Sequence, residues 1–258
     1  MSTKKLKSDT GPKITLAALI GPGLMVAATG VGAGDLAAAT VAGANFGIVL
    51  IWAIVIGAFF KYVLTEGIAR WQLATDTTIL EGWGKYLPGW VKIYFGIYML
   101  LWTISVSAAL ANACGLGISN LTGGAIPTSW GTIIHSLIGC LLVWIGGYKG
   151  FEKIMQGLIG LMVISIVACA ALTFNDVSGV MTGLLIPTMP IGSTGSLLAL
   201  IGGVGGTITI LNYSYWMNEK RMTGPAFLKY VRTDLIVAYM VTAILAIAVL
   251  LLANQAFF

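Results

Sequence analysis

Long apolar segments separated by short polar stretches run along the whole chain. A helix needs about 20 apolar residues to cross a bilayer, and most of these segments reach that length. The pattern therefore predicts an all-α integral membrane protein with about seven transmembrane helices. The expected segments are residues 14–43, 46–68, 92–118, 130–147, 153–173, 195–217 and 233–253.

The basic residues predict how these segments are oriented. Thirteen of the 14 Lys and Arg residues lie before the first segment or in alternate connections, and Lys61 is the exception. The opposite connections, such as "SNLTGGAIPTSW", contain none. Because cytoplasmic loops carry the excess of Lys and Arg, we expect residues 1–13 to form a cytoplasmic tail. The net charge of +5 follows from this topology, and no nucleic-acid partner is expected.

Composition supports a lipid bilayer as the surroundings of the chain. It is 58% hydrophobic and 9% charged, whereas about 25% of the residues of a soluble domain are charged. We expect a multi-pass protein of a bacterial inner (plasma) membrane. Cys114, Cys140 and Cys169 lack C-x-x-C spacing and are expected to be packing residues. His135 is the single histidine, which excludes a multi-histidine metal site and favours a helix–helix hydrogen bond.

Glycine-rich stretches interrupt the first and sixth segments, in "GPGLMVAATGVGAGD" and "IGGVGGTITILN". Glycine costs about 1 kcal/mol relative to alanine inside a helix, so these clusters need a reason. Close helix packing is one reason, and Gly202 and Gly206 have the spacing for it. Unwinding near the bilayer midplane is the other, and interruptions five segments apart are typical of inverted-repeat transporters. We therefore predict a single transporter domain over 1–258, with a first five-helix repeat at 14–173 and the start of a second at 195–258.

One carboxylate lies inside the apolar first segment. Asp35 is surrounded by apolar and glycine residues, and an ionised carboxylate there costs at least about 2.5–3.5 kcal/mol. We expect this cost to be offset by the cargo that the protein handles.

The second segment carries two further charges, Lys61 and Glu66. They are five residues apart and should point about 140° away from each other around the helix. Lys61 needs a carbonyl, a water-filled cavity or a carboxylate from another helix, and structural, gating and proton-relay roles remain open. Glu66 precedes Arg70 by four residues, the favourable order for an ion pair.

Two other aspartates lie near segment ends. Asp176 falls in an outer connection and Asp234 at the start of the seventh segment. Both are predicted to be solvated or to cap a helix.

The run "GPGLMVAATGVGAGDLAAATVAGANFG" resembles the first helix of the Nramp divalent-metal transporters. The similarity continues through "RWQLATDTTILEGWGKYLPGW", the third to fifth segments, "GGTITILNYSYWMNEKR" and "RTDLIVAYM". The resemblance implies a LeuT-type fold of two inverted five-helix repeats, usually with an eleventh helix, of which this chain matches the first seven. It also implies a secondary transporter that moves a divalent cation by alternating access, with no enzymatic activity and no cofactor besides the transported ion.

The motifs of the family are altered in this chain. The family's Asp-Pro-Gly-Asn falls on residues 32–35, so that its aspartate ligand is a glycine and its asparagine an aspartate. Its Met-Pro-His-Asn falls on residues 209–212, where threonine replaces the methionine ligand. The acidic residues usual in the third helix have no counterpart in "YFGIYMLLWTISVSAALANACG". The resemblance implies metal ligation by Gly32, Asp35, Gly206 and Thr209, with Gly34 and Asn212 as further substrate-site candidates and Lys61 and Glu66 as charge-relay or gating candidates.

The implied ligands are all oxygen atoms, which suit harder cations than a methionine thioether does. This set favours Mg²⁺, Ca²⁺ or a monovalent ion over Fe²⁺, and it still accepts Mn²⁺. Mg²⁺ gives up its water reluctantly, so its site would have to hold a hydrated ion. Because one carboxylate does not neutralise a divalent ion, carbonyl ends of helices would have to contribute.

Four other readings compete with a metal transporter. "GAGD" fits the Gly-x-Gly-Asp signature of intramembrane aspartyl proteases, but no second span carries the aspartate that such a dyad needs. A seven-helix receptor would have the opposite orientation. A carrier of the same fold for a monovalent ion or a small organic solute such as an amino acid remains open, and so does a channel. Because the second repeat stops after two helices, we expect the chain to be a fragment of a longer protein and not to transport by itself.

Overall fold

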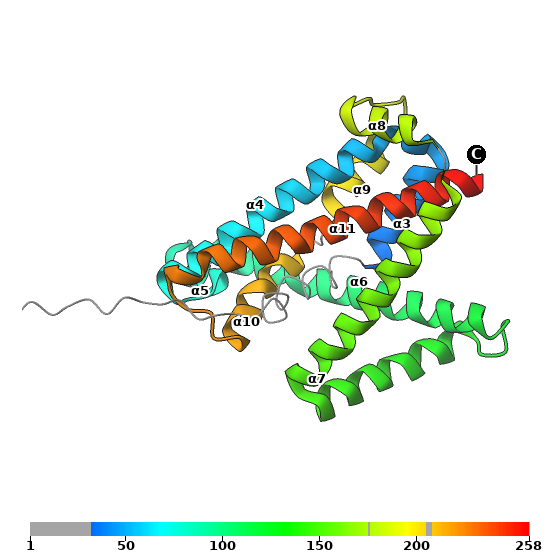
Figure 1. The fold of residues 1–258 in the computed structure, drawn as a ribbon. Coiled ribbons are helices and arrows are strands. Elements are labelled where there is room, and N and C mark those ends of the chain that lie inside the picture. The colour runs from blue at the N-terminus through cyan, green and yellow to red at the C-terminus, as the bar shows by residue number, and fades with distance from the viewer. Residues whose placement is uncertain (1–31, 175, 205–207, 258) are drawn as a thin grey trace, which may run out of the picture.

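The computed structural model describes residues 32–174, 176–204 and 208–257, and all regular structure in these ranges is helical (Figure 1). This confirms the predicted all-α class. The α-helices are α3 (Ala33–Phe46), α4 (Ile51–Thr75), α5 (Ile79–Tyr86), α6 (Gly89–Leu121), α7 (Thr128–Thr173), α8 (Val177–Leu185), α9 (Thr194–Gly203), α10 (Asn212–Glu219) and α11 (Leu228–Phe257). Three short 3₁₀ turns are η1 (Gly47–Leu50), η2 (Ile208–Leu211) and η3 (Pro225–Phe227).

Six helical stretches of the described chain are long and apolar enough to cross a membrane. The first of them, Ala33–Thr75, joins two predicted segments, which the η1 turn separates into α3 and α4. Residues 14–31 of the first predicted segment lie outside the described residues. The fourth and fifth predicted segments are the two halves of α7, which change direction at Gly147, where φ is 54°. The chain is therefore a multi-pass membrane protein.

The core lies between α3, α4, α9 and α11. Figure 1 shows α4 and α11 side by side and running in opposite directions. Helix α3 packs against α11, and α9 packs against α3 and α4. Apolar side chains that are completely buried line these contacts; among them are Leu50, Ile51, Ile54, Leu235 and Leu250. The start of α3, where half-buried Asp35 lies, faces the end of α9 in this bundle.

Two glycines set how closely these helices approach. A Cβ atom on Gly43 of α3 would overlap the carbonyl oxygen of Leu250 and lie 3.0 Å from the Cβ of Ala253, both in α11. A Cβ atom on Gly57 of α4 would lie 3.0 Å from the Cα of Ile201 in α9. Both contacts involve backbone atoms, so a larger residue would push the helices apart.

Gly43→Ala should therefore lower stability by about 1–3 kcal/mol, the usual range for overpacking a filled contact. Gly67→Ala is the matched control because its Cβ would meet no atom within 4 Å. This control should raise stability by up to about 1 kcal/mol through helix propensity. Thermal unfolding in detergent compares the two, and equal stability of Gly43→Ala and the parent chain would contradict the predicted contact.

The hairpin of α6 and the first half of α7 extends away from α4 and α11 (Figure 1). Its two helices pack through Gly115, which lies against Thr128 and Thr132. Gly115 is the one buried residue of α6, and most of the large side chains on the rest of its surface are apolar and exposed. Such an apolar surface is what a hydrocarbon environment or further helices require.

Asp176 caps α8, in agreement with the sequence-based expectation for this residue. Its Oδ1 accepts hydrogen bonds from the amide of Gly179 and the hydroxyl of Ser178, both at 2.9 Å. These bonds, the backbone one first, hold the pKa of Asp176 below its usual value.

A lowered folded-state pKa means that the cap stabilises α8 above the unfolded pKa of about 4 and is lost as the pH falls through the folded value. The protection of α8 amides against hydrogen exchange, measured relative to the intrinsic rate at each pH, should therefore fall in acid. Asp176→Asn, which keeps an accepting oxygen without a titrating group, should remove this pH dependence. Identical acid profiles for the two chains would exclude a role of the Asp176 carboxylate.

Candidate functional site

The site is built around the first turn of α3. Gly32 precedes this helix in an extended conformation, with φ −81° and ψ 168°. The Oδ2 atom of Asp35 accepts a hydrogen bond from the amide of Gly32 at 3.1 Å. Gly34 is exposed, and a Cβ atom there would meet no atom within 4 Å. One carboxylate oxygen of Asp35 is thus used in a hydrogen bond at the start of α3, and the neighbouring Gly34 borders open space.

The sixth segment is broken, as its glycines predict. Helix α9 ends at Gly203, Val204 has a non-helical ψ of 115°, and α10 begins only at Asn212. Gly202 is exposed, and a Cβ atom added to it would contact nothing within 4 Å, which disfavours the close-packing explanation at this glycine. Gly206, a predicted carbonyl ligand, lies outside the described residues.

Asp35 joins the start of α3 to the end of α9. A Cβ atom on Gly203 would lie 2.7 Å from Oδ1 of Asp35, which is the oxygen that the Gly32 amide does not use. The carboxyl end of a helix carries partial negative charge from its last carbonyl groups. The Oδ1 atom and the end of α9 therefore create a locally negative position that suits a cation.

Two predicted site residues lie beyond the break. Thr209 is in the η2 turn, and its Oγ1 is buried with no hydrogen-bond partner in the described part of the chain. Asn212 is the first residue of α10 and is exposed. A buried hydroxyl without a partner is costly, so Thr209 has an oxygen free to serve a ligand.

Lys61 lies on α4 and is only 8% exposed. Its ammonium group interacts electrostatically with the carboxylate of Asp35. Of the three kinds of partner expected from the sequence, a carboxylate from another helix is therefore present.

Glu66 lies one turn further along α4 and is 4% exposed. Its Oε2 pairs with Arg70, as predicted, and its Oε1 accepts a hydrogen bond from Nε of Arg232 at 2.8 Å. The contact with Arg232 joins α4 to α11. Glu66 therefore ties two helices together, and its role in charge relay or gating stays a prediction.

The prediction for Asp234 was wrong. It is 4% exposed and accepts a hydrogen bond from the hydroxyl of Tyr213 at 2.9 Å, which links α11 to α10. Helix α11 begins at Leu228, five residues before the predicted segment, so Asp234 lies well inside the helix instead of at its start.

Two further interhelical contacts involve residues that the sequence pattern did not single out. Glu152, 6% exposed, pairs with Lys220 at 2.7 Å and so joins α7 to the end of α10. The hydroxyl groups of Thr65 and Tyr239 lie 2.6 Å apart between α4 and α11. Such pairs depend on the relative rotation of the helices, which residue spacing in the sequence does not predict.

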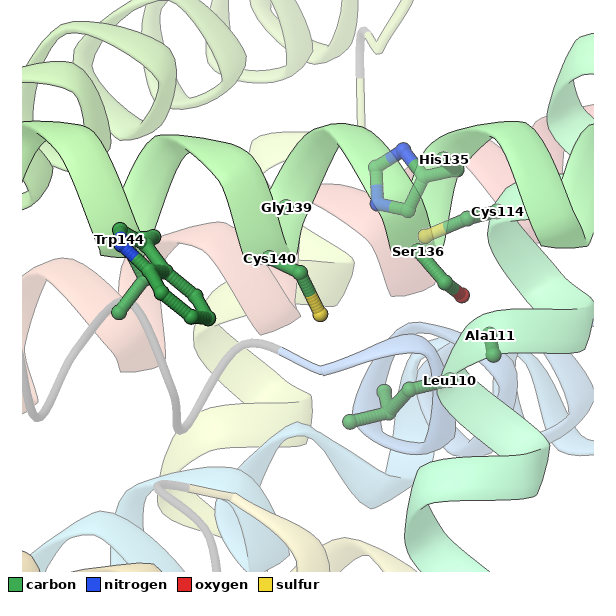
Figure 2. A pocket seen from close by; sticks show the side chains of 9 residues that line it. Leu110, Ala111, Cys114, His135, Ser136, Gly139, Cys140 and Trp144 are labelled. Atoms are coloured by element: carbon green, nitrogen blue, oxygen red, sulfur yellow. The ribbon is translucent and has the colours of Figure 1, made fainter.

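His135 and two of the cysteines lie at a groove between α6 and α7 with a volume of about 590 Å³ (Figure 2). Cys114 and Ser136 lie near His135, and Cys140 is one turn further along α7. No group of three or more His, Cys, Asp or Glu side chains able to hold a metal occurs within the described ranges. Apart from His135 and Ser136, the groove is lined by apolar residues, glycine and the two thiols. Cys140 and Cys169 are exposed and Cys114 is half-buried, so the described structure does not bury them as packing residues.

The helices and the Asp35 site define the class of the protein: a multi-pass helical membrane protein with a carboxylate between the start of α3 and the end of α9. Residues 23–258 match the family model described as natural resistance-associated macrophage protein-like. The chain belongs to this family, Nramp.

Its relatives are similar at modest identity. An uncharacterized protein of Pasteurella multocida (strain Pm70) is 27% identical over 91% of this chain and 55% of its own length. The divalent metal cation transporter MntH of Bacillus subtilis is 24% identical over 93% of this chain and 58% of its own length. The metal transporter Nramp6.2 of Populus trichocarpa is 28% identical over 72% of this chain and 34% of its own length. The chain thus spans about half the length, or less, of these relatives.

Proposed function

We propose that this chain forms the cation-binding part of a secondary transporter that moves a divalent metal ion, Mg²⁺, Mn²⁺ or a similar ion, by alternating access. In this proposal the ion lies on the Oδ1 side of Asp35, against the carbonyl end of α9. Thr209 Oγ1 and carbonyl groups near Gly32 and Gly206 complete an all-oxygen site. A cytoplasmic N-terminus, inverted repeats and a bacterial inner membrane belong to the same proposal.

The observation that carries the proposal is the position of Asp35 between two helix ends. A half-buried carboxylate could be wholly structural if both of its oxygens were used by the α3 start. Only Oδ2 accepts the Gly32 amide, and Oδ1 faces the end of α9. The names of MntH and Nramp6.2 support a metal ion as cargo for relatives of this chain.

The cargo is proposed to be a hard or borderline divalent ion because of the donor atoms. Carboxylate, hydroxyl and carbonyl oxygens suit Mg²⁺, Ca²⁺ and Mn²⁺, whereas soft ions prefer sulfur ligands. The three cysteines are far along the chain from residues 32–35, and two of them lie at the α6–α7 groove.

One observation favours a second cargo, a monovalent ion or a small organic solute such as an amino acid. Lys61 offsets the negative charge of Asp35 and so weakens the attraction for a doubly charged ion. The ammonium group and the positive start of α3 would also attract a carboxylate.

Calorimetry on the chain in lipid nanodiscs separates these cargoes, with Mg²⁺, Ca²⁺, Mn²⁺, Na⁺ and glycine titrated in turn. The proposal predicts saturable binding of divalent ions and weaker or absent binding of Na⁺. Saturable binding of Na⁺ or glycine without any divalent ion would support the second cargo and reject the first.

Thr209→Met should shift the preference of the site toward softer ions. A thioether in place of a hydroxyl removes a hard ligand and adds a soft one. We expect Cd²⁺ affinity to rise and Mg²⁺ affinity to fall, so that their ratio changes by about ten-fold or more, equivalent to about 1.4 kcal/mol. Thr40→Met, on the exposed face of α3, is the control and should leave the ratio unchanged. An unchanged ratio in Thr209→Met would remove Thr209 from the site.

A further inference from the structure

Lys61 is held inside the bilayer region by its place on α4. It lies ten residues after the start of the helix and 14 before its end, which is roughly 15 and 21 Å along the axis. A lysine side chain is too short to span either distance to the head groups. On the opposite face of α4, Phe59 and Val63 are exposed. Lys61 therefore faces the protein interior and not lipid.

The packing of α4 on α9 brings Lys61 to the Asp35 site. Gly57, one turn before Lys61, lies against Ile201. Ile201 is two residues before Gly203, which faces Oδ1 of Asp35. This geometry agrees with the electrostatic interaction between the Lys61 ammonium and the Asp35 carboxylate.

We propose that Lys61 is the selectivity-determining residue of the Asp35 cation site, because its ammonium neutralises the empty site and repels the incoming ion. This inference rests on the proposed function, since it takes Asp35 as the group that holds the cation. In the empty protein the pair avoids an isolated carboxylate in a low-dielectric interior. When a cation binds to Asp35, the ammonium becomes a like charge beside it, and the ion is held less tightly.

Coulomb's law makes the effect depend on the charge of the ion. The repulsion between Lys61 and a divalent ion is twice that for a monovalent ion at the same position. Removing the ammonium should therefore raise the divalent association constant by about the square of the factor for a monovalent ion. A gain of about ten-fold for Na⁺ would correspond to about 100-fold for Mg²⁺. Lys61 thus limits how strongly the site retains a divalent ion.

The test uses calorimetric titrations of Na⁺, Mg²⁺ and Mn²⁺ into nanodiscs that contain the full chain, Lys61→Met, Lys61→Arg or Asp35→Asn. Lys61→Met should bind divalent ions on the order of 100-fold more tightly, while Lys61→Arg, which keeps the charge, should stay within a few-fold of the parent chain. Lys61→Gln is measured beside Lys61→Met as a second neutral variant. Lys153→Met, an exposed position on α7, controls for the loss of one net positive charge and should change little.

Unchanged or weaker divalent binding in both neutral Lys61 variants, with binding abolished by Asp35→Asn, would overturn the role of Lys61 and leave the proposed function standing. Equal gains for Na⁺ and Mg²⁺ would also overturn it. No cation binding in any of these chains would instead overturn the proposed function, and the role of Lys61 in selectivity with it.

A double-mutant cycle, measured by thermal unfolding in ion-free buffer, tests the interaction between Lys61 and Asp35 without any bound cargo. Lys61→Met and Asp35→Asn should each lower the unfolding midpoint, and the double variant should lose less than the sum of the two. Additive losses would overturn the pairing of the empty site.

Discussion

Asp35→Asn should weaken divalent-ion binding by about 100-fold or more while leaving the fold intact. The asparagine oxygen can still accept the hydrogen bond that the Gly32 amide donates at 3.1 Å, so the start of α3 is retained. The change removes the negative charge, and a divalent ion loses its strongest attraction in a low-dielectric site. Calorimetry with Mn²⁺ measures the effect, and the unfolding midpoint of the variant verifies that it is folded.

Asp76→Asn is the matched control for this substitution. Asp76 is exposed and follows α4 in the left-handed conformation, with φ 55°, which asparagine also adopts readily. The control makes the same chemical change away from the site, and it should bind Mn²⁺ as the parent chain does. Equal binding by Asp35→Asn and Asp76→Asn would mean that Asp35 has a structural role alone.

Replacing Arg70 and Arg232 together with glutamine should destabilise the chain strongly, whereas either replacement alone should have only a small effect. Glu66 is 5% exposed in its side chain and is paired with both arginines, which are themselves about half exposed. One remaining arginine keeps the carboxylate compensated, since each pairs with a different oxygen. Removing both arginines leaves the Glu66 carboxylate unpaired in the interior. The loss of stability in the double variant should therefore exceed the sum of the two single losses.

Adding Glu66→Gln to the double arginine variant should restore most of the lost stability, because the cost arises from the unpaired carboxylate. Urea or thermal unfolding of these chains completes the comparison. Simple additivity of the two arginine losses, or no rescue by Glu66→Gln, would show that Glu66 is hydrated in the folded protein.

The helical class was predictable because a membrane span leaves a long signal. Apolar runs of about 20 residues identify helices regardless of how these pack. The break in the sixth segment was predictable for a related reason, since Gly202 and Gly203 occur where a helix would otherwise be favoured. The short helices α5 and α8 were not predicted, because eight or nine residues carry too little periodicity and their caps act locally.

Side-chain partners were predictable only within one helix. Glu66 and Arg70 are four residues apart, so the geometry of a single helix brings them together. The contacts of Glu66 with Arg232 and of Asp234 with Tyr213 depend on helix rotation and register, and so does the electrostatic interaction of Lys61 with Asp35. In this chain those are set by close backbone approaches such as Gly57 on Ile201, which have no signature in the sequence beyond a glycine.

Only part of the site was predictable, because its residue could be found from the sequence and its interhelical neighbours could not. The cost of a carboxylate in an apolar segment singled out Asp35 without any knowledge of its neighbours. The sequence did not show that its two oxygens have different surroundings. One accepts a hydrogen bond from the Gly32 amide and the other faces the end of α9, because two helices that are far apart in the sequence pack together.

The most direct test of the account is the position of a bound Mn²⁺ ion, located by its anomalous scattering in crystals of the full chain. The account predicts one peak about 2.0–2.6 Å from Oδ1 of Asp35, against the carbonyl end of α9. A peak that contacts neither Asp35 nor α9, or no peak at a saturating Mn²⁺ concentration, would contradict it.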